Sequence, residues 1–416
     1  MLTGFFMGCR AAAVVAISLA LVVGTAATAS AASQELAPSA DLAAALKEFQ
    51  LQESSQPVRE TMRGWSAPHK IVVTVDEPGR TAWLQQAMPK GVTVVGVPDE
   101  AAAGSQLADA DALVYFGCNP GTFAKAPRAK WVHVASGGAD QCLATPGIAR
   151  GEILLTNGQK VKNTLMAEEA MGYVFALARS IDVGVRNQLR GELNSTGHGR
   201  RWKQLQGATM LIVGLGGAGV EIARIANAVG MKVIATRNSS REGPDFVSYV
   251  GLADETPKLV GEADVVVICA PLTPATRGLF NAAMFARMKK DAILVNWTRA
   301  EITVAEDLAA ALKAGTIGSA ALNWATSKPL PKDHPLWSAP NLILAPWGGT
   351  GMGGGTPLGS GTGTGTGPGS GVQANKATRA GGDSTRDARW LVVRENIRRF
   401  ATGDKMYSVF DLERGY

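Results

Sequence analysis

Three glycines between an apolar run and a helical pattern are the residues of this chain whose spacing most clearly indicates a chemistry. Gly214, Gly216 and Gly219 follow residues 209–213, which have the composition of a buried strand, and open the helical pattern of residues 220–226. Gly214 permits a tight turn, Gly216 lets the backbone approach a pyrophosphate, and Gly219 lets helix and strand pack closely. The N–H groups and dipole of the helix N-terminus would then hold the phosphates. We therefore predict a dinucleotide-binding turn rather than an ordinary glycine turn, with contact residues Gly214, Gly216, Gly217, Ala218 and Gly219.

The strand predicted next, at residues 232–236, indicates which dinucleotide is preferred. Units that bind NAD place an acidic residue about 20 residues after the glycines, where it takes the ribose hydroxyls. Arg237 stands at this position, between Thr236 and Asn238. A guanidinium can bind a 2′-phosphate through paired hydrogen bonds, with help from hydroxyl and amide donors, whereas a carboxylate would repel it. We predict binding of NADP in preference to NAD; the alternative is a solvated surface loop that contains arginines.

Length and charge limit the class of protein. The chain has 416 residues, enough for two domains of ordinary size, and 46% of them are hydrophobic, which supports real cores. The net charge of +6 is spread along the chain instead of forming a basic stripe, and no basic patch is interleaved with aromatic residues. We therefore expect a solvated surface and no nucleic-acid partner.

An uncharged segment near the N-terminus has the layout of a secretory signal peptide. Residues 11–34 carry no charge, Arg10 stands before them, and small residues that suit cleavage follow at residues 27–31. The apolar run 11–24 is too short for a comfortable membrane span. We predict that residues 1–31 direct export to a periplasmic or other extracytoplasmic compartment and that only this leader meets the membrane. The alternative is an uncleaved signal anchor, because a slightly longer stretch could just cross a thin bilayer.

The cysteines form no recognisable pattern. Cys9 falls in the leader, which leaves Cys118, Cys142 and Cys269. Their scattered spacing predicts neither a metal site nor a disulfide framework. We expect them to be buried small apolar residues.

From residue 70 onward, short apolar runs alternate with helical patterns, which predicts parallel sheets flanked by helices. The predicted strands are residues 71–75, 92–96, 112–116 and 131–135 in one sheet, and residues 209–213, 232–236, 265–269, 293–296, 320–322 and 342–344 in the other. The predicted helices include a short amphipathic one at residues 39–49, a long one at residues 166–190 that could link the two domains, and a basic one at residues 383–400 that buries Trp390, Leu391, Val393 and Ile397.

Several segments, most of them after the glycine turn, together resemble the D-isomer-specific 2-hydroxyacid dehydrogenases. The resemblance covers roughly residues 131–416 apart from a tract of Gly, Thr, Ser and Pro, and it is carried by the glycine turn and by residues 270–279, 288–289, 296–300, 320–323, 329–331, 333–337 and 411–416. It implies an α/β fold with two Rossmann-like, doubly wound domains, parallel sheets and an active-site cleft between the domains. It also implies a homodimer formed through the dinucleotide domain.

The leader and this resemblance together set the predicted domain boundaries. They are a signal peptide at residues 1–31, a linker with a short helix at 32–68, a discontinuous flavodoxin-like substrate domain at 69–193 and 346–416, and an NAD(P)-binding Rossmann domain at 194–345. The substrate domain contains the Gly-rich loop 348–371, which is expected to be mobile. Such a composition cannot bury enough apolar surface to offset the entropy lost on ordering.

The reaction that the resemblance implies is reversible hydride transfer between NAD(P)H and a small 2-keto acid such as glyoxylate or hydroxypyruvate. In that reaction an arginine fixes the carboxylate and polarises the carbonyl, a histidine exchanges the proton, and a glutamate orients the histidine. Arg299 matches the arginine, and Gly138 and Ala139 match a turn whose backbone N–H groups bind the substrate carboxylate. The remaining implied cofactor contacts are Ala270, Pro271, Thr298 and Asn323, the last replacing a family aspartate near the nicotinamide amide.

Two catalytic positions depart from the family pattern. Lys328 stands where the glutamate is expected, and Trp347 stands where the histidine is expected. An indole N–H can donate a hydrogen bond but cannot exchange a proton near neutral pH. Lys328 could donate the proton if burial beside Arg299 lowered its pKa, or it could be an exposed lysine. We predict a slow oxidoreductase or, alternatively, a scaffold that binds NAD(P) or a carboxylate without turnover. The histidines lie elsewhere and are expected to be structural: His69, His133, His198 and His334.

Overall fold

The computed structural model describes residues 40–75, 77, 79–193, 202–238, 240–324, 330–346 and 382–415. Four predicted features lie outside these residues: the leader at 1–31, Lys328, Trp347 with the Gly-rich loop 348–371, and His198. Within the described residues, no helix combines the length and the apolar character that crossing a membrane requires.

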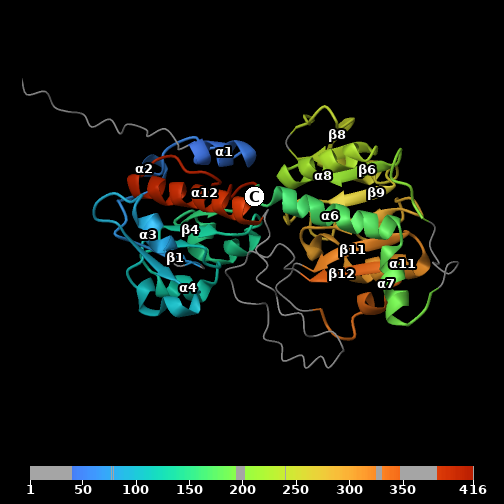
Figure 1. Ribbon diagram of the computed structural model, residues 1–416, viewed down its shortest axis with the longest axis horizontal. Helices are drawn as coiled ribbons and strands as arrows, with labels where there is room; N and C mark the ends of the chain where they lie inside the picture. The colour runs from blue at the N-terminus through green and yellow to red at the C-terminus, as the bar shows by residue number, and fades with distance from the viewer. Residues whose placement is uncertain are drawn as a thin grey trace, which may run out of the picture. The chain divides into compact units, whose positions relative to one another are not determined.

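Five parallel strands form the first sheet, in the order β2-β1-β3-β4-β5, and Figure 1 labels β1 and β4 among them. Their bounds are β1 Lys70–Thr74, β2 Thr93–Val97, β3 Ala112–Val114, β4 Trp131–Val134 and β5 Leu154–Asn157. Every residue of β3 and β4 is buried, as expected for a parallel sheet that helices cover on both faces. The predicted strands β1 to β4 are confirmed to within two residues, whereas β5 was not predicted.

Helices pack against both faces of this sheet. On one face, Trp390, Ile397 and Phe400 of α12 (Gly382–Thr402) pack with Trp131 of β4. On the other face, Phe123 packs with Leu113 and Val132. The predicted burial of Trp390, Val393 and Ile397 is confirmed, and Leu391 is only partly buried. The other helical segments here are α2 Val58–Thr61, α3 Arg80–Gln85, η1 Ala101–Leu107, α4 Pro120–Lys125, η2 Asp140–Ala144 and α5 Pro146–Ala149.

Helix α1 (Ala40–Glu48) confirms the short amphipathic helix that was predicted at residues 39–49. Leu42, Ala45 and Phe49 are buried, and they form one cluster with Val392 of α12. The apolar face of α1 thus meets a helix from the far end of the chain. The apolar face of α1 is therefore covered by packing rather than left to solvent.

Seven parallel strands form the second sheet, in the order β12-β11-β10-β9-β6-β7-β8. Their bounds are β6 Thr209–Val213, β7 Lys232–Arg237, β8 Tyr249–Leu252, β9 Val265–Ile268, β10 Ile293–Asn296, β11 Ser319–Trp324 and β12 Leu342–Pro346. The strands predicted here are confirmed, and β8, at the edge of the sheet, was not predicted. This order places β6 and its glycine turn beside β9 and β7, near the middle of the sheet.

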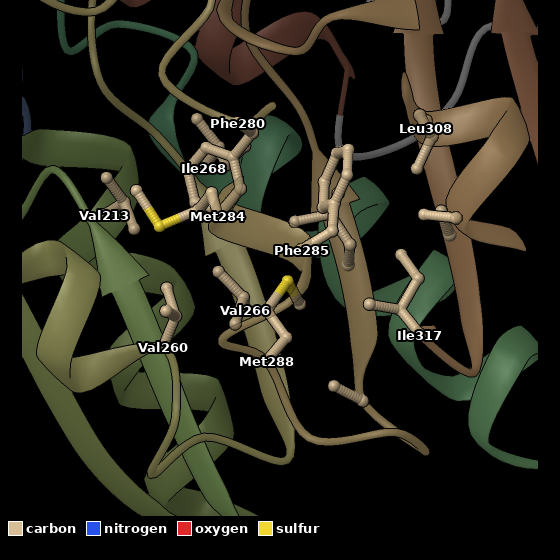
Figure 2. Close-up of a cluster of buried hydrophobic side chains, with 14 of the residues drawn as sticks. Val213, Val260, Val266, Ile268, Phe280, Met284, Phe285, Met288, Leu308 and Ile317 are labelled. Carbon is tan, nitrogen blue, oxygen red and sulfur yellow. The ribbon is translucent and has the colours of Figure 1, made fainter. Parts of the chain in front are cut away.

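Apolar side chains also fill both faces of the second sheet. Figure 2 shows one of these cores, in which Phe280, Met284 and Phe285 pack against Val266 and Ile268 of β9. On the opposite face, α8 (Gly217–Ala228) contributes buried residues to a second core. The other helical segments are η3 Ala253–Glu255, α9 Thr256–Leu259, α10 Ala282–Phe285, η4 Ala300–Ile302, α11 Ala305–Ala314 and η5 Pro335–Ser338.

The long helix predicted at residues 166–190 is two helices, α6 (Asn163–Ala178) and α7 (Ile181–Leu189). The break falls at Ser180, whose φ of 54° is left-handed and cannot continue a right-handed helix. Met171 and Val174 of α6 are buried in the same core as α8. The packing of α6 therefore joins it to the seven-stranded sheet, although the predicted boundary at residue 193 places it with the other domain.

The prediction that the cysteines form no disulfide is wrong. Cys118, after β3, is bonded to Cys142 in η2, with their Cα atoms 4.7 Å apart. Since β3 and β4 are parallel neighbours, the loops that follow them leave the same edge of the sheet and can meet. Cys269 remains a thiol, and burial raises its pKa to about 12, which agrees with an unreactive apolar role.

Candidate active site

The turn between β6 and α8 uses its glycines for different reasons. Gly214 has a φ of +102°, and a Cβ on it would lie 2.7 Å from the backbone nitrogen of Ala270. A Cβ on Gly219 would collide with the carbonyl oxygen of Gly214. Gly216, in contrast, is exposed and faces open space. Two of the glycines are thus required by packing, while Gly216 leaves its backbone accessible, as the approach of a phosphate demands.

The start of α8 supplies the donors for such a phosphate. The helix begins at Gly217 with Gly216 as its N-cap, and the first N–H groups of a helix have no acceptor within it. The side chain of Asn163, from the start of α6, lies against Gly217, so that a Cβ there would require Asn163 to move. Asn163 was not predicted as a site residue, because only the packing of α6 on α8 brings it to this turn.

The end of β7 lies against the glycine turn. Thr236 is buried, and its carbonyl oxygen accepts hydrogen bonds from the N–H groups of Gly214 and Leu215 at 3.1 and 3.0 Å. Arg237 follows, and its Nη1 donates to the carbonyl oxygen of Glu242 at 2.9 Å. The backbone thus places Arg237, with the exposed Asn238, at the edge of the predicted dinucleotide site.

Asn323 fits the nicotinamide end of a dinucleotide. Its side chain is buried at the end of β11, and within the described residues its Oδ1 atom has no hydrogen-bond partner. A buried carbonyl oxygen of this kind is costly unless a donor reaches it, and a carboxamide N–H is such a donor. Ala270 packs against Gly214 at the same edge of the sheet. Nearby, the Pro271 carbonyl oxygen accepts from Thr276 Oγ1 at 2.7 Å, and Thr298 N–H donates to Asn296 Oδ1 at 3.2 Å.

Arg299 forms an ion pair with Asp140. Its Nε and Nη2 atoms donate to Asp140 Oδ1 at 3.1 and 2.9 Å, and the side chains are 15% and 27% exposed. A Cβ on Gly138 would lie 2.6 Å from Arg299 Nη2, so the guanidinium lies directly against this turn. Two sequence-predicted substrate contacts, Arg299 and Gly138, are therefore brought together, with the buried Ala139 between Gly138 and Asp140.

The backbone on both sides of this pair is held by side-chain hydrogen bonds. Asn296 Nδ2 donates to the carbonyl oxygen of Arg299 at 2.9 Å and to Thr303 Oγ1 at 3.0 Å. On the opposite side, Ser136 Oγ donates to the carbonyl oxygen of Gly138 at 2.6 Å. Asp140 was not predicted as a partner of Arg299, although it belongs to the quoted turn, because the pairing joins residues 159 positions apart.

The described histidines lie in or beside strands β1 and β4 and at the start of η5. His133 is buried in β4, where its Nδ1 atom lies 2.8 Å from Thr156 Oγ1. His334 lies at the start of η5 with Nε2 3.5 Å from Glu306, and His69 precedes β1. These positions agree with structural roles. Within the described part of the chain, no three His, Cys, Asp or Glu side chains gather as metal ligands.

Comparisons with known proteins agree with this geometry. The family model of the D-isomer specific 2-hydroxyacid dehydrogenase NAD binding domain matches residues 171–349. The chain is 31% identical over 274 residues to a glyoxylate reductase of Korarchaeum cryptofilum, covering 64% of this chain and 78% of that protein. It is 32% identical over 233 residues to a glycerate dehydrogenase of Methylorubrum extorquens, covering 54% of this chain and 70% of that protein.

A solved structure superimposes on most of the chain. The D-isomer specific 2-hydroxyacid dehydrogenase family protein from Aeromonas salmonicida superimposes with a TM-score of 0.64 at 25% identity, covering 83% of this chain and 100% of that chain. Sequence and fold therefore lead to one assignment: the chain belongs to the D-isomer specific 2-hydroxyacid dehydrogenase family.

Proposed function

We propose that this chain reduces a small 2-keto acid, such as glyoxylate or hydroxypyruvate, with NADPH, and that it does so slowly. The observation that carries the proposal is the pairing of Arg299 with Asp140 against Gly138, in a chain whose glycine turn is open at Gly216. The names of two similar proteins, a glyoxylate reductase and a glycerate dehydrogenase, support the same class of substrate.

The described residues provide binding and charge. Arg299 presents a planar cation that suits a carboxylate and the carbonyl beside it, and Asp140 fixes its orientation. Asn157 Nδ2 donates to the carbonyl oxygen of Gly137, and Ser136 Oγ donates to that of Gly138. These hydrogen bonds fix the turn, so that its N–H groups can meet a substrate carboxylate. When bound, the nicotinamide cofactor supplies the hydride.

We attribute the expected slowness to the substitutions Trp347 and Lys328 at the family's histidine and glutamate positions. General acid–base catalysis contributes about 10²–10⁴-fold, so the deficit should be of that size. Steady-state turnover of glyoxylate with NADPH tests this, beside the double variant Trp347→His with Lys328→Glu. The double variant should be faster than either single variant, because the carboxylate orients the ring. Ordinary turnover that is abolished by Lys328→Ala would instead identify Lys328 as the proton donor.

The same substitutions favour a second candidate, a scaffold that binds NAD(P) or a carboxylate without turnover. A titration of NADPH and of oxamate, an unreactive 2-keto acid analogue, separates the two candidates. Binding of both with no turnover on any 2-keto acid of two to four carbons supports the scaffold. Measurable turnover that is lost in Arg299→Ala supports the enzyme.

The preference for NADP rests on Arg237, whose side chain is only partly buried at the end of β7. Charge-assisted hydrogen bonds to a 2′-phosphate contribute about 1.5–3 kcal/mol, so NADPH should bind about tenfold to a hundredfold more tightly than NADH. Arg237→Asp should reverse the preference. Arg224→Asp, on the exposed side of α8 in an ion pair with Glu221, is the matched control and should leave it unchanged. Equal affinities in the unmodified protein contradict this proposal.

A homodimer is supported by an apolar stripe on α7. Ile181, Val185 and Leu189 repeat at a spacing of four residues and are 53%, 53% and 83% exposed. A one-sided stripe of this kind is typical of an interface, and a second copy of the same helix would cover it. Light scattering should show a dimer that Leu189→Glu dissociates and that the neighbouring exposed change Gln188→Glu does not.

Export is proposed from the leader at residues 1–31. The Cys118–Cys142 disulfide supports it, because stable disulfides are typical of oxidising compartments. Mass spectrometry of the protein from its native cells should show an N-terminus near residue 30. An intact leader on protein recovered from the soluble cytoplasmic fraction would rule export out.

A further inference from the structure

The Cys118–Cys142 disulfide ends beside the turn that holds Arg299. Cys142 lies two residues after Asp140, and its N–H donates to the carbonyl oxygen of Ala139 at 2.9 Å. Both cysteines are buried, with 8% and 0% of their surface exposed, in the apolar cluster under the sheet edge. The turn of residues 138–140 is thus covalently linked to the loop that follows β3.

Hydrogen bonds hold the loop after β3 in place, so the disulfide restricts the motion of the turn that is attached to it. Tyr115 N–H donates to the carbonyl oxygen of His133 at 2.7 Å, and Gly117 N–H donates to Glu100 Oε2 at 3.2 Å. Thr145 Oγ1, beyond η2, donates to the carbonyl oxygen of Cys118 at 3.2 Å. Hydrogen bonds and the disulfide therefore bind the two loops together on both sides of η2.

We propose that Cys118 and Cys142 are positioning residues: their disulfide holds the turn of Gly138 and Asp140 against Arg299, so that carboxylate affinity depends on the thiol–disulfide state. The carboxylate part of this inference rests on the proposed function. Reduction by a dithiol such as dithiothreitol breaks the S–S bond through a mixed disulfide. Each protein sulfur becomes a thiol, and the dithiol is oxidised to its cyclic disulfide.

Reduction should move the turn because the two sulfurs lie inside a packed cluster. Bonded sulfurs can be closer than van der Waals contact, whereas two thiols cannot. Phe123 and Ile148 belong to the same buried cluster as the two cysteines, and a packed core adjusts to such a change by shifting a neighbouring element. The short segment η2, which carries both Cys142 and Asp140, is directly attached to the bond.

The test compares the full-length protein, purified under oxidising conditions, with the variant Cys118→Ala and Cys142→Ala. Cys269→Ala, which removes the remaining described thiol far from the disulfide in sequence, is the matched control. Peptide mapping should find Cys118 linked to Cys142. Hydrogen exchange at residues 138–142 should be about tenfold faster in the double variant and in protein reduced by dithiothreitol, and unchanged in the control.

Calorimetry with oxamate and NADPH supplies the second measurement. The dissociation constant of oxamate should rise about tenfold in the double variant, while that of NADPH stays within twofold, since a merely unfolded variant would lose both. Unlinked cysteines in the oxidised protein, or equal exchange at residues 138–142 in all variants, overturn the proposal. If the oxidised protein binds NADPH but no oxamate while exchange still differs, the positioning role stands and the proposed function fails instead.

Discussion

The two parts of the candidate active site are assembled in different ways. The glycine turn takes nearly all of its parts from one stretch, β6, α8 and β7, and a Cβ on Gly214 or Gly219 would meet backbone atoms. The turn of residues 138–140, called the carboxylate turn below, brings Asp140 to Arg299, which is 159 residues away. Cys142, two residues after Asp140, is bonded to Cys118. A local site tolerates little change in shape, whereas a site assembled from distant segments depends on the side chains that join them.

Removal of Arg299 should have the largest effect, because the assembled site depends on it. Arg299→Ala removes the guanidinium that pairs with Asp140, and with it the cation proposed to meet a carboxylate. We expect a loss of about 3 kcal/mol in oxamate binding, or a factor of about 10², with NADPH binding retained. Calorimetry measures both. Arg277→Ala, an exposed arginine, is the control, and equal oxamate affinity in both variants would falsify the assignment.

A pair of glycine substitutions should separate packing from ligand approach in the local site. Gly219→Ala places a Cβ against the Gly214 carbonyl, so both thermal stability and NADPH affinity should fall, by about 2 kcal/mol each. Gly216→Ala faces open space and should lower NADPH affinity alone. Thermal unfolding and a fluorescence titration of NADPH provide the readouts. If Gly216→Ala binds NADPH as the unmodified protein does, the phosphate does not approach this residue.

The buried His133 of β4 should make the stability of the protein fall in acid. Burial lowers the pKa of His133 from 6.5 to about 3. Below pH 6.5 the unfolded chain binds a proton at His133, whereas the folded protein does not bind it until about pH 3. The free energy of unfolding therefore falls as the pH drops through this window. The loss between pH 7 and pH 5 should be about 2 kcal/mol.

Urea unfolding at these two pH values, with His133→Gln for comparison, isolates this contribution. The variant lacks the titrating ring, so its free energy of unfolding should change less between pH 7 and pH 5. Parallel behaviour of the two proteins would show that the pKa of His133 is not lowered in the folded state.

Asp140→Asn should have the smallest effect. The amide oxygen can still accept from Arg299 Nε and Nη2, but it carries no charge. We expect oxamate affinity to fall by about 1 kcal/mol, and by more in Asp140→Ala, which removes the acceptor altogether. An unchanged affinity in Asp140→Ala would mean that Arg299 is oriented without Asp140.

The sequence predicted the contacts that lie within one strand–turn–helix unit. The roles of Gly214 and Gly219 follow from backbone geometry over six residues, and both are confirmed. The alternation of apolar runs and helical patterns was enough for the fold class. Strand β5 and edge strand β8 were missed, and the break at Ser180 was not seen, because a single left-handed residue leaves the helical pattern of the sequence unchanged.

What the amino-acid sequence determined by itself is therefore the fold class, the glycine turn and the choice of Arg299 as a candidate substrate contact. Only the tertiary structure decided which side chains join that arginine. Parallel pairing of β3 with β4 brings Cys118 to Cys142, and the structure brings Asp140 to Arg299. No local pattern encodes these contacts, because they depend on which strands become neighbours and on which loops then share a sheet edge.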